Sequence, residues 1–144
     1  MRGLRLAGLA LAVVALGAGC GSKQTAVRHA PKDQATKTCQ NALAQYEILR
    51  RDLDPVLANP SDSTADRRLD NDAERLKPTL AALIPAADVD QQAALSVYRS
   101  ELRDLQTALH AALAGDISTA QSLLSGVSGR LVGLPTLIHA LCKA

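Results

Sequence analysis

The chain has 144 residues, of which 47% are hydrophobic, 21% charged and 1% aromatic, a size that suits one small domain. Two of its 16 basic residues, Arg2 and Arg5, lie in a segment that we expect to be removed, which leaves 14 basic and 14 acidic residues and no net formal charge. A neutral chain without Trp or Phe lacks the positive surface and the stacking platforms of nucleic-acid binders, so we expect no nucleic-acid partner.

The first twenty residues have the pattern of an export signal. Two arginines precede an unbroken run of apolar residues and glycine over residues 6–16, which is shorter than the roughly 20 residues of a membrane-spanning helix. The run ends in LGAGC at residues 16–20. This ending resembles the lipobox of bacterial lipoproteins, with Gly17 where leucine is commonest. The resemblance covers residues 1–20 only. It implies that residues 1–19 are a signal peptide that is removed and that Cys20 carries a diacylglyceryl group.

A lipid-modified Cys20 would decide where the protein resides. Two acyl chains anchor a protein stably, whereas a single chain binds only marginally. We therefore expect a protein anchored in the cell membrane or outer membrane, with its domain facing the periplasm or the cell exterior. The expected partners are the membrane and an unidentified envelope protein, and the oligomeric state stays open.

Residues 20–37 have the composition of a tether. They are polar, show no apolar periodicity and are expected to be disordered. Four basic residues against one acidic residue give this segment a net charge of +3, whereas residues 38–144 carry −3. A basic tether would lie close to an anionic membrane surface. The alternative is a solvated linker whose charge is incidental.

The rest of the chain has the apolar spacing of helices. Apolar residues recur at intervals of three and four, which predicts amphipathic helices over about 36–58, 63–84, 89–114 and 117–142. Asn59-Pro60-Ser61, Pro85 and Gly115 mark the connections, and Asp88 and Asp116 are the expected helix caps. No segment alternates with the period of a strand. Similar helix lengths and short connections predict an all-α, up-down-up-down four-helix bundle over residues 38–144.

Two cysteines are placed to close this bundle. Once Cys20 carries lipid, Cys39 and Cys142 remain, and an oxidising compartment would pair them. Cys39 begins the first predicted helix and Cys142 ends the fourth, so both would lie at the same pole. We expect a disulfide there. Closing a loop of about 100 residues would stabilise the fold by about 4–5 kcal/mol.

Side chains that carry chemistry do not form a recognisable catalytic or metal site. In an up-down-up-down bundle His110 and His139 would lie about 27 Å apart, at 1.5 Å per residue, which is too far to share a metal. No nucleophile elbow or metal-binding spacing occurs, so we expect no enzymatic activity, no cofactor and no metal. One acidic row stands at intervals of four on the second helix, and we favour a solvated face over a cation site. Its members are Asp62, Asp66, Asp70 and Glu74.

The fourth predicted helix contains an unusual run of helix-disfavouring residues. These are Gly126, Gly129, Gly133 and Pro135. Such a run indicates a kink or a close backbone approach, within the bundle or between molecules. The alternative, which we favour, is a small-residue face that accommodates a bulky neighbour.

Both tyrosines are expected near that run. Counting residues outward from each connection places them in one layer of the bundle with the glycine–proline break and with one arginine of the second helix. This layer is either a small ligand pocket or, as we favour, ordinary packing in which the tyrosine hydroxyls bond to carbonyls freed by proline. The candidate pocket residues are Tyr46, Arg75, Tyr98, Gly133 and Pro135.

The resulting functional prediction is a membrane-anchored exported lipoprotein that acts as a binding or protein-interaction module without catalytic activity. The alternative is a carrier of a small ligand, haem or metal in the bundle interior. Di-iron bundles that resemble ferritin use inward Glu-x-x-His pairs. Here Thr107 and Thr136 stand where the glutamates would precede His110 and His139, so this alternative lacks its usual ligands.

Overall fold

The computed structural model describes residues 32–143, and within this range the chain is helical apart from short connections. The predicted all-helical class is therefore confirmed, and no strand occurs among these residues. The expected signal peptide, the lipidation site at Cys20 and most of the expected tether lie outside the described residues. In chain order the elements are α1 (Lys32–Ala58), α2 (Ser63–Leu83), the short 3-10 helix η1 (Ile84–Ala86), α3 (Val89–Leu113), α4 (Ile117–Leu131) and α5 (Leu134–Lys143).

The first helix begins earlier than its apolar pattern. Residues 32–37, which the composition assigned to the tether, form the first turns of α1. Pro31 is the last residue before α1 that disfavours a helix, and neither glycine nor proline follows until Pro55. The polar residues at the start of α1 therefore extend the helix instead of interrupting it.

Three aspartates begin the helices that follow. The Asp88 side chain accepts a hydrogen bond from the Gln91 amide at 2.8 Å, and the Gln91 side chain accepts one from the Asp88 amide at 3.0 Å, which completes the expected capping box. Asp116 caps α4, and Asp62 caps α2 in the same way. Gly115 has a φ of +87°, the left-handed conformation that ends α3 and favours glycine.

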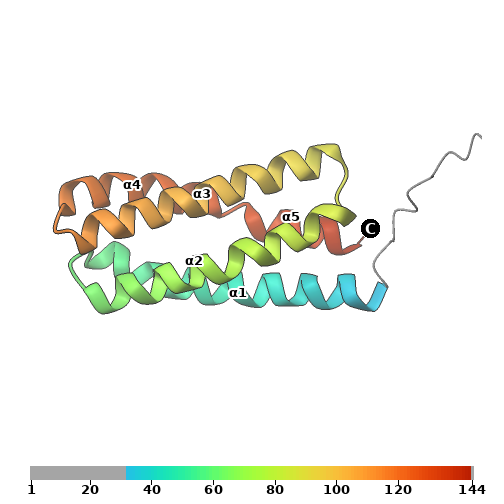
Figure 1. Cartoon of the computed structure of the whole chain (residues 1–144), viewed down its shortest axis with the longest axis horizontal. Coiled ribbons are helices and arrows are strands. Elements are labelled where there is room, and N and C mark those ends of the chain that lie inside the picture. Colours follow the sequence, from blue (N-terminus) through green and yellow to red (C-terminus); the bar gives the residue numbers. More distant parts are fainter. Residues whose placement is uncertain (1–31, 144) are drawn as a thin grey trace, which may run out of the picture.

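The helices form an elongated bundle in which neighbours in sequence are also neighbours in space. Helix α2 packs against both α1 and α3, and α4 packs against α3. The α1–α2 and α3–α4 connections lie at one end of the bundle, and the α2–α3 connection lies at the other (Figure 1). Helix α5 lies against α1, so that the last helix meets the first.

The core follows the predicted apolar spacing. Buried leucine, alanine, valine and isoleucine side chains from all five α-helices form one cluster. Of the apolar residues that recur at intervals of three and four, Tyr98 and Ile117 are half-buried and the others are buried. Each buried leucine contributes about 1.5–3 kcal/mol relative to an exposed one, and this sum makes the bundle stable without large aromatic side chains.

A disulfide joins the first and last helices, as predicted. Cys39 of α1 is bonded to Cys142 of α5, and their Cα atoms are 5.9 Å apart, a usual separation for a disulfide. The bond lies where α1 enters the bundle and α5 leaves it. It therefore fixes the two ends of the described chain together.

The prediction of one continuous helix over 117–142 was wrong. Residues 132 and 133 form a turn, so that α4 ends at Leu131 and α5 begins at Leu134. Pro135 explains the break, because in a continuous helix its ring would clash with the carbonyl of Leu131 and its missing N–H would leave that carbonyl unbonded. In the first turn of α5 the same proline is well tolerated.

Candidate functional site

The structure brings Tyr98 against the turn between α4 and α5. A β-carbon built on Gly133 would lie closer to the Tyr98 hydroxyl than real β-carbons approach any atom. Tyr46 is 5% exposed, and burial raises its pKa. Tyr98 lies close enough to add to that shift. Tyr98 thus lies against Gly133, and its side chain fills the space beside that glycine.

Arg75 and Pro135 have other surroundings. Arg75 is an exposed residue of α2, and its charge acts on Asp72. The neighbouring Leu76 occupies the buried stripe, so Arg75 projects about 100° away from it around the helix. Pro135 is half-buried in the first turn of α5. The small ligand pocket that we weighed against ordinary packing in this layer therefore stays a hypothesis.

The acidic row of α2 is only in part the solvated face that we favoured, because Asp62 and Glu74 are exposed whereas Asp66 is buried and Asp70 half-buried. Asp62 is the helix cap, and Asp66 is 1% exposed with one carboxylate oxygen, Oδ1, that lacks a hydrogen-bond partner. Burial, and to a smaller extent the charge of Asp62, raise the pKa of Asp66. Asp70 and Glu74 face α3 and bond to it. The apolar stripes located the core but gave no sign that these carboxylates lie at its margin.

Gln106 joins α3 to α2 through a polar network. Its side-chain amide donates to Asp70 Oδ1 at 2.8 Å and to Glu74 Oε1 at 2.7 Å, and its oxygen accepts from Lys77 Nζ at 2.7 Å. Lys77 also donates to Glu74 at 2.6 Å. Hydrogen bonds from Lys77 and Gln106 lower the pKa of Glu74. His110 extends the network, with its Nε2 atom 3.8 Å from Asp70 Oδ2.

A pair of carboxyl groups lies between α1 and α2. Asp72 is 7% exposed and is hydrogen-bonded to Asp52, whose other neighbour is the guanidinium of Arg51. Burial raises the pKa of Asp72, and the charge and hydrogen bond of Asp52 raise it further, against the opposing charges of Arg75 and Arg51. A neighbouring carboxylate disfavours the ionised form of a buried carboxyl group, which is the direction in which Asp52 acts on Asp72. Each aspartate precedes a residue of the buried stripe, which is the only sequence signal for this pair.

Helix α3 separates its charges between two faces. Glu101 is largely buried and accepts a hydrogen bond from Arg130 of α4 at 2.6 Å, and Asp104 lies 4.0 Å from the same guanidinium. Arg99 and Arg103 lie toward α2, where neither forms an ion pair with any of the described residues. The acidic residues of α3 are therefore paired with Arg130 of α4, whereas Arg99 and Arg103 are not paired with a carboxylate of the described residues.

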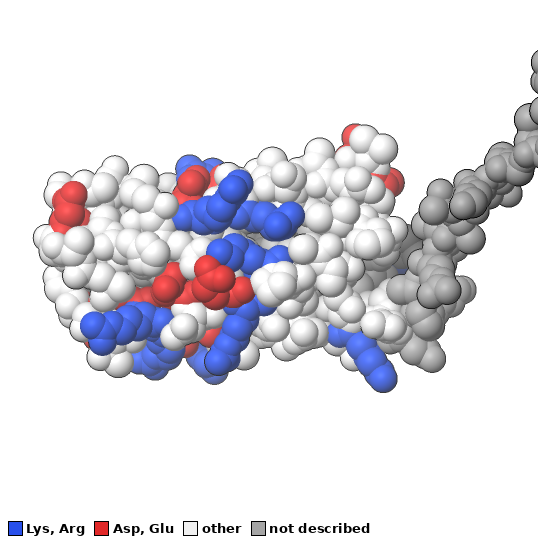
Figure 2. Space-filling view, in the orientation of Figure 1, with Lys and Arg blue, Asp and Glu red and all other residues white. Residues whose placement is uncertain are grey.

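A shallow groove of about 530 Å³ runs between α2 and α3. Its lining combines small residues with long basic side chains. In Figure 2 basic side chains gather over the middle of this face, next to a group of acidic ones. The residues that line this α2–α3 groove are Lys77, Pro78, Ala81, Ser96, Arg99 and Arg103. The apolar stripes could not reveal this groove, because the groove depends on which residues outside the stripes face each other across two helices.

Over residues 32–143, no three or more histidine, cysteine, aspartate or glutamate side chains gather closely enough to hold a metal ion. None of the helices described in the structure has the length and hydropathy needed to cross a membrane. Comparison with protein-family models, curated proteins and solved structures gives no match to this chain.

Proposed function

We propose that the protein is a lipid-anchored lipoprotein of the cell envelope whose helical bundle is a non-catalytic binding or protein-interaction module. The observation that carries the proposal is the Cys39–Cys142 disulfide. Structural disulfides persist in oxidising compartments and are rare in the cytosol. The bond therefore agrees with the export signal and leaves Cys20 as the one cysteine available for lipid.

The proposed topology of the module is up-down-up-down, with α4 and α5 together forming the fourth rod. Connections at alternating ends of the bundle support this topology (Figure 1). In it, the tether enters at the pole that the disulfide closes. The anchor would then hold the bundle by one pole, with its sides turned toward partners in the periplasm or outside the cell.

Lipidation is tested by the mass of the mature N-terminus and by labelling with a palmitate analogue in the native host. We expect a diacylated N-terminal Cys20, and Cys20→Ala should abolish the label and leave unprocessed precursor. The matched control is the double variant Cys39→Ala/Cys142→Ala, which removes the other two cysteines and should keep the label. An unmodified N-terminus downstream of Cys20 would refute the proposed anchor.

The binding role is separated from the carrier alternative by two measurements on purified protein. An optical absorption spectrum detects haem directly, and elemental analysis detects a bound metal. We expect neither, together with specific enrichment of an envelope protein when the lipidated protein is isolated from its own membranes. A stoichiometric chromophore or metal would favour the carrier instead.

A further inference from the structure

We infer that the α2–α3 groove binds a phosphate-bearing anion. The inference deepens the binding role proposed above by naming the chemistry of one site. It starts from the composition of the groove. Three of its six lining residues are basic, one is a serine, and none is acidic. The domain over residues 38–144 carries a net charge of −3, so the groove lining is positive although the domain as a whole is negative.

The basic residues lie in positions that converge on the groove. Ser96, Arg99 and Arg103 are spaced three and four residues apart and therefore lie along one stripe of α3. Lys77 reaches the same groove from α2, where Pro78 and Ala81 are too short to fill it. The hollow thus exists because small side chains face each other between longer cationic ones.

The two arginines are available to a ligand. Like charges four residues apart on a helix repel each other, and Arg99 and Arg103 have no carboxylate within ion-pair distance in the part of the chain that the structure describes. The carboxylates of the same helix, Glu101 and Asp104, are directed to Arg130 instead. An anion between the two guanidinium groups would relieve their repulsion.

Lys77 is already held in place. Its ammonium group donates to Glu74 at 2.6 Å and to Gln106 at 2.7 Å, which leaves one of its three donor hydrogens for a ligand. Guanidinium groups bind phosphate oxygens in pairs of parallel hydrogen bonds, and a serine hydroxyl adds another donor. Several oxygens on one tetrahedral centre match this set of donors better than a single carboxylate does.

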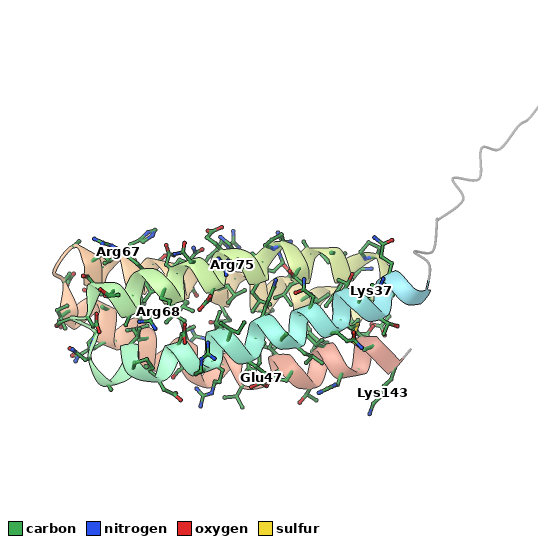
Figure 3. The ribbon with its side chains drawn as sticks, turned by 90° about the horizontal axis from the view of Figure 1, so that it is seen from below. Lys37, Glu47, Arg67, Arg68, Arg75 and Lys143 are labelled. Atoms are coloured by element: carbon green, nitrogen blue, oxygen red, sulfur yellow. A yellow bond between two sulfur atoms is a disulfide. The ribbon has the colours of Figure 1, made fainter. Side chains whose placement is uncertain are left out.

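A phosphate group can reach the groove from two sources, a soluble phosphate compound or the headgroup of an anionic phospholipid. Both are tested with the mature lipidated protein by the rate at which phenylglyoxal modifies each arginine. In neutral detergent micelles we expect pyrophosphate to protect Arg99 and Arg103. Arg67 and Arg68 serve as internal controls, because they lie on α2 about 15 Å before Lys77 along the helix. Figure 3 shows both of them toward the end at which α1 and α2 are connected.

Vesicles distinguish the lipid source. Protection of Arg99 and Arg103 in phosphatidylglycerol vesicles, without protection by pyrophosphate in micelles, would assign the phosphate to a headgroup. Protection by pyrophosphate would assign it to a soluble compound. Phosphatidylcholine vesicles control for simple shielding by the bilayer, because their headgroups carry no net charge.

Paired variants test whether the groove itself is responsible. Arg99→Gln/Arg103→Gln should weaken binding about tenfold or more, because it removes charged hydrogen bonds to the anion. Arg67→Gln/Arg68→Gln removes the same charge elsewhere and should change affinity less than about twofold, in line with the small effect of distant screened charges. Equal losses in both pairs, or no protection by pyrophosphate or anionic vesicles, would overturn the inference. Protection by pyrophosphate measures anion binding in the groove whether or not Cys20 carries lipid. A negative result would therefore refute the anion site without refuting the proposed lipid anchor.

Discussion

The hydroxyl of Tyr98 occupies the place that a β-carbon at position 133 would need. Gly133 has no positive φ, so its backbone conformation is open to other residues, and a side chain at this position would have to displace the Tyr98 hydroxyl. The relationship also locates the break between α4 and α5 against α3. The turn that Pro135 requires thus packs against Tyr98, and Gly133 leaves room there for the tyrosine hydroxyl.

Substitution of Gly133 by alanine is therefore expected to destabilise the bundle by about 1–3 kcal/mol, the usual range for overpacking. The matched control is Gly129→Ala in α4, where a new β-carbon meets nothing within 4 Å. Because alanine favours a helix over glycine, this control should stabilise the protein by up to about 1 kcal/mol. Thermal unfolding should therefore show a lower unfolding temperature for Gly133→Ala and a higher one for Gly129→Ala than for the native protein.

The double variant Gly133→Ala/Tyr98→Phe separates packing from a pocket. Removing the hydroxyl leaves the ring carbon that carried it as the nearest atom, 3.6 Å from the new β-carbon, which is ordinary contact. We expect the phenylalanine to recover most of the loss caused by alanine. If Gly133→Ala instead stabilises the free protein, the space beside Gly133 is an open pocket and the packing interpretation is wrong.

Loss of the disulfide should have the largest effect of any change at the pole. Cys39→Ala/Cys142→Ala removes a cross-link across 103 positions, which is worth about 4–5 kcal/mol in the chain-entropy model. Chemical denaturation with and without reductant should show this loss for the native protein and no effect of reductant on the variant. Two free thiols in protein isolated from its native compartment would contradict the bond itself.

The pH dependence of stability follows from the buried carboxyl groups. Folding raises the pKa of Asp66 and Asp72 above the ordinary aspartate value of 3.8. A group whose pKa is higher in the folded state binds its proton more tightly there, so the fold gains stability as the pH falls from neutral through the raised pKa values toward 3.8. Glu74 and Asp116 act oppositely at lower pH, because their pKa values are lowered.

We therefore expect the unfolding temperature to be higher in mildly acidic buffer than at pH 7, and to fall again in stronger acid. Asp72→Asn should raise the unfolding temperature at pH 7 and flatten the gain on acidification, because the amide needs no proton to donate to Asp52. The surface variant Asp90→Asn, in the first turn of α3, is the control and should keep the slope of the native protein. A slope unchanged in Asp72→Asn would contradict the assignment.

The polar network between α2 and α3 makes a further prediction. Gln106→Ala removes the hydrogen bonds to Asp70, Glu74 and Lys77, and should cost about 1–3 kcal/mol as a loss of bonds to charged groups. Thr107→Ala alters the next, exposed residue and should change stability by less than about 0.5 kcal/mol. Denaturant titration of the two variants provides the comparison. Equal stabilities would show that water replaces the network without loss.

Apolar periodicity predicted most of this fold because burial in a bundle depends on it directly. Leu49, Leu76 and Leu102 lie in the core because the spacing of three and four places them on inward faces. Asp88 and Asp116 were recognisable as caps because capping acts over three residues. Such short-range rules need no knowledge of neighbouring helices.

Features that arise between helices were harder to predict, with one exception. Counting residues outward from the Gly115 turn placed Tyr98 level with Gly133, because a turn fixes the pairing of the helices on either side of it. The burial of Asp66, the Asp52–Asp72 pair and the groove beside Arg99 depend on how each helix is rotated against its neighbour. Residues beside an apolar stripe are equally compatible with solvent or with a neighbouring helix, so the sequence pattern alone could not assign them.

The bond between Cys39 and Cys142 makes the chain from one to the other a covalent ring. A protease that cuts once in any of its connections opens the ring but releases no fragment, and the helices on both sides of the cut stay attached. Two cuts are needed before a piece can leave. In the cell envelope, where we propose that the protein resides, this ring would let the packed core keep its helices together after a first cleavage.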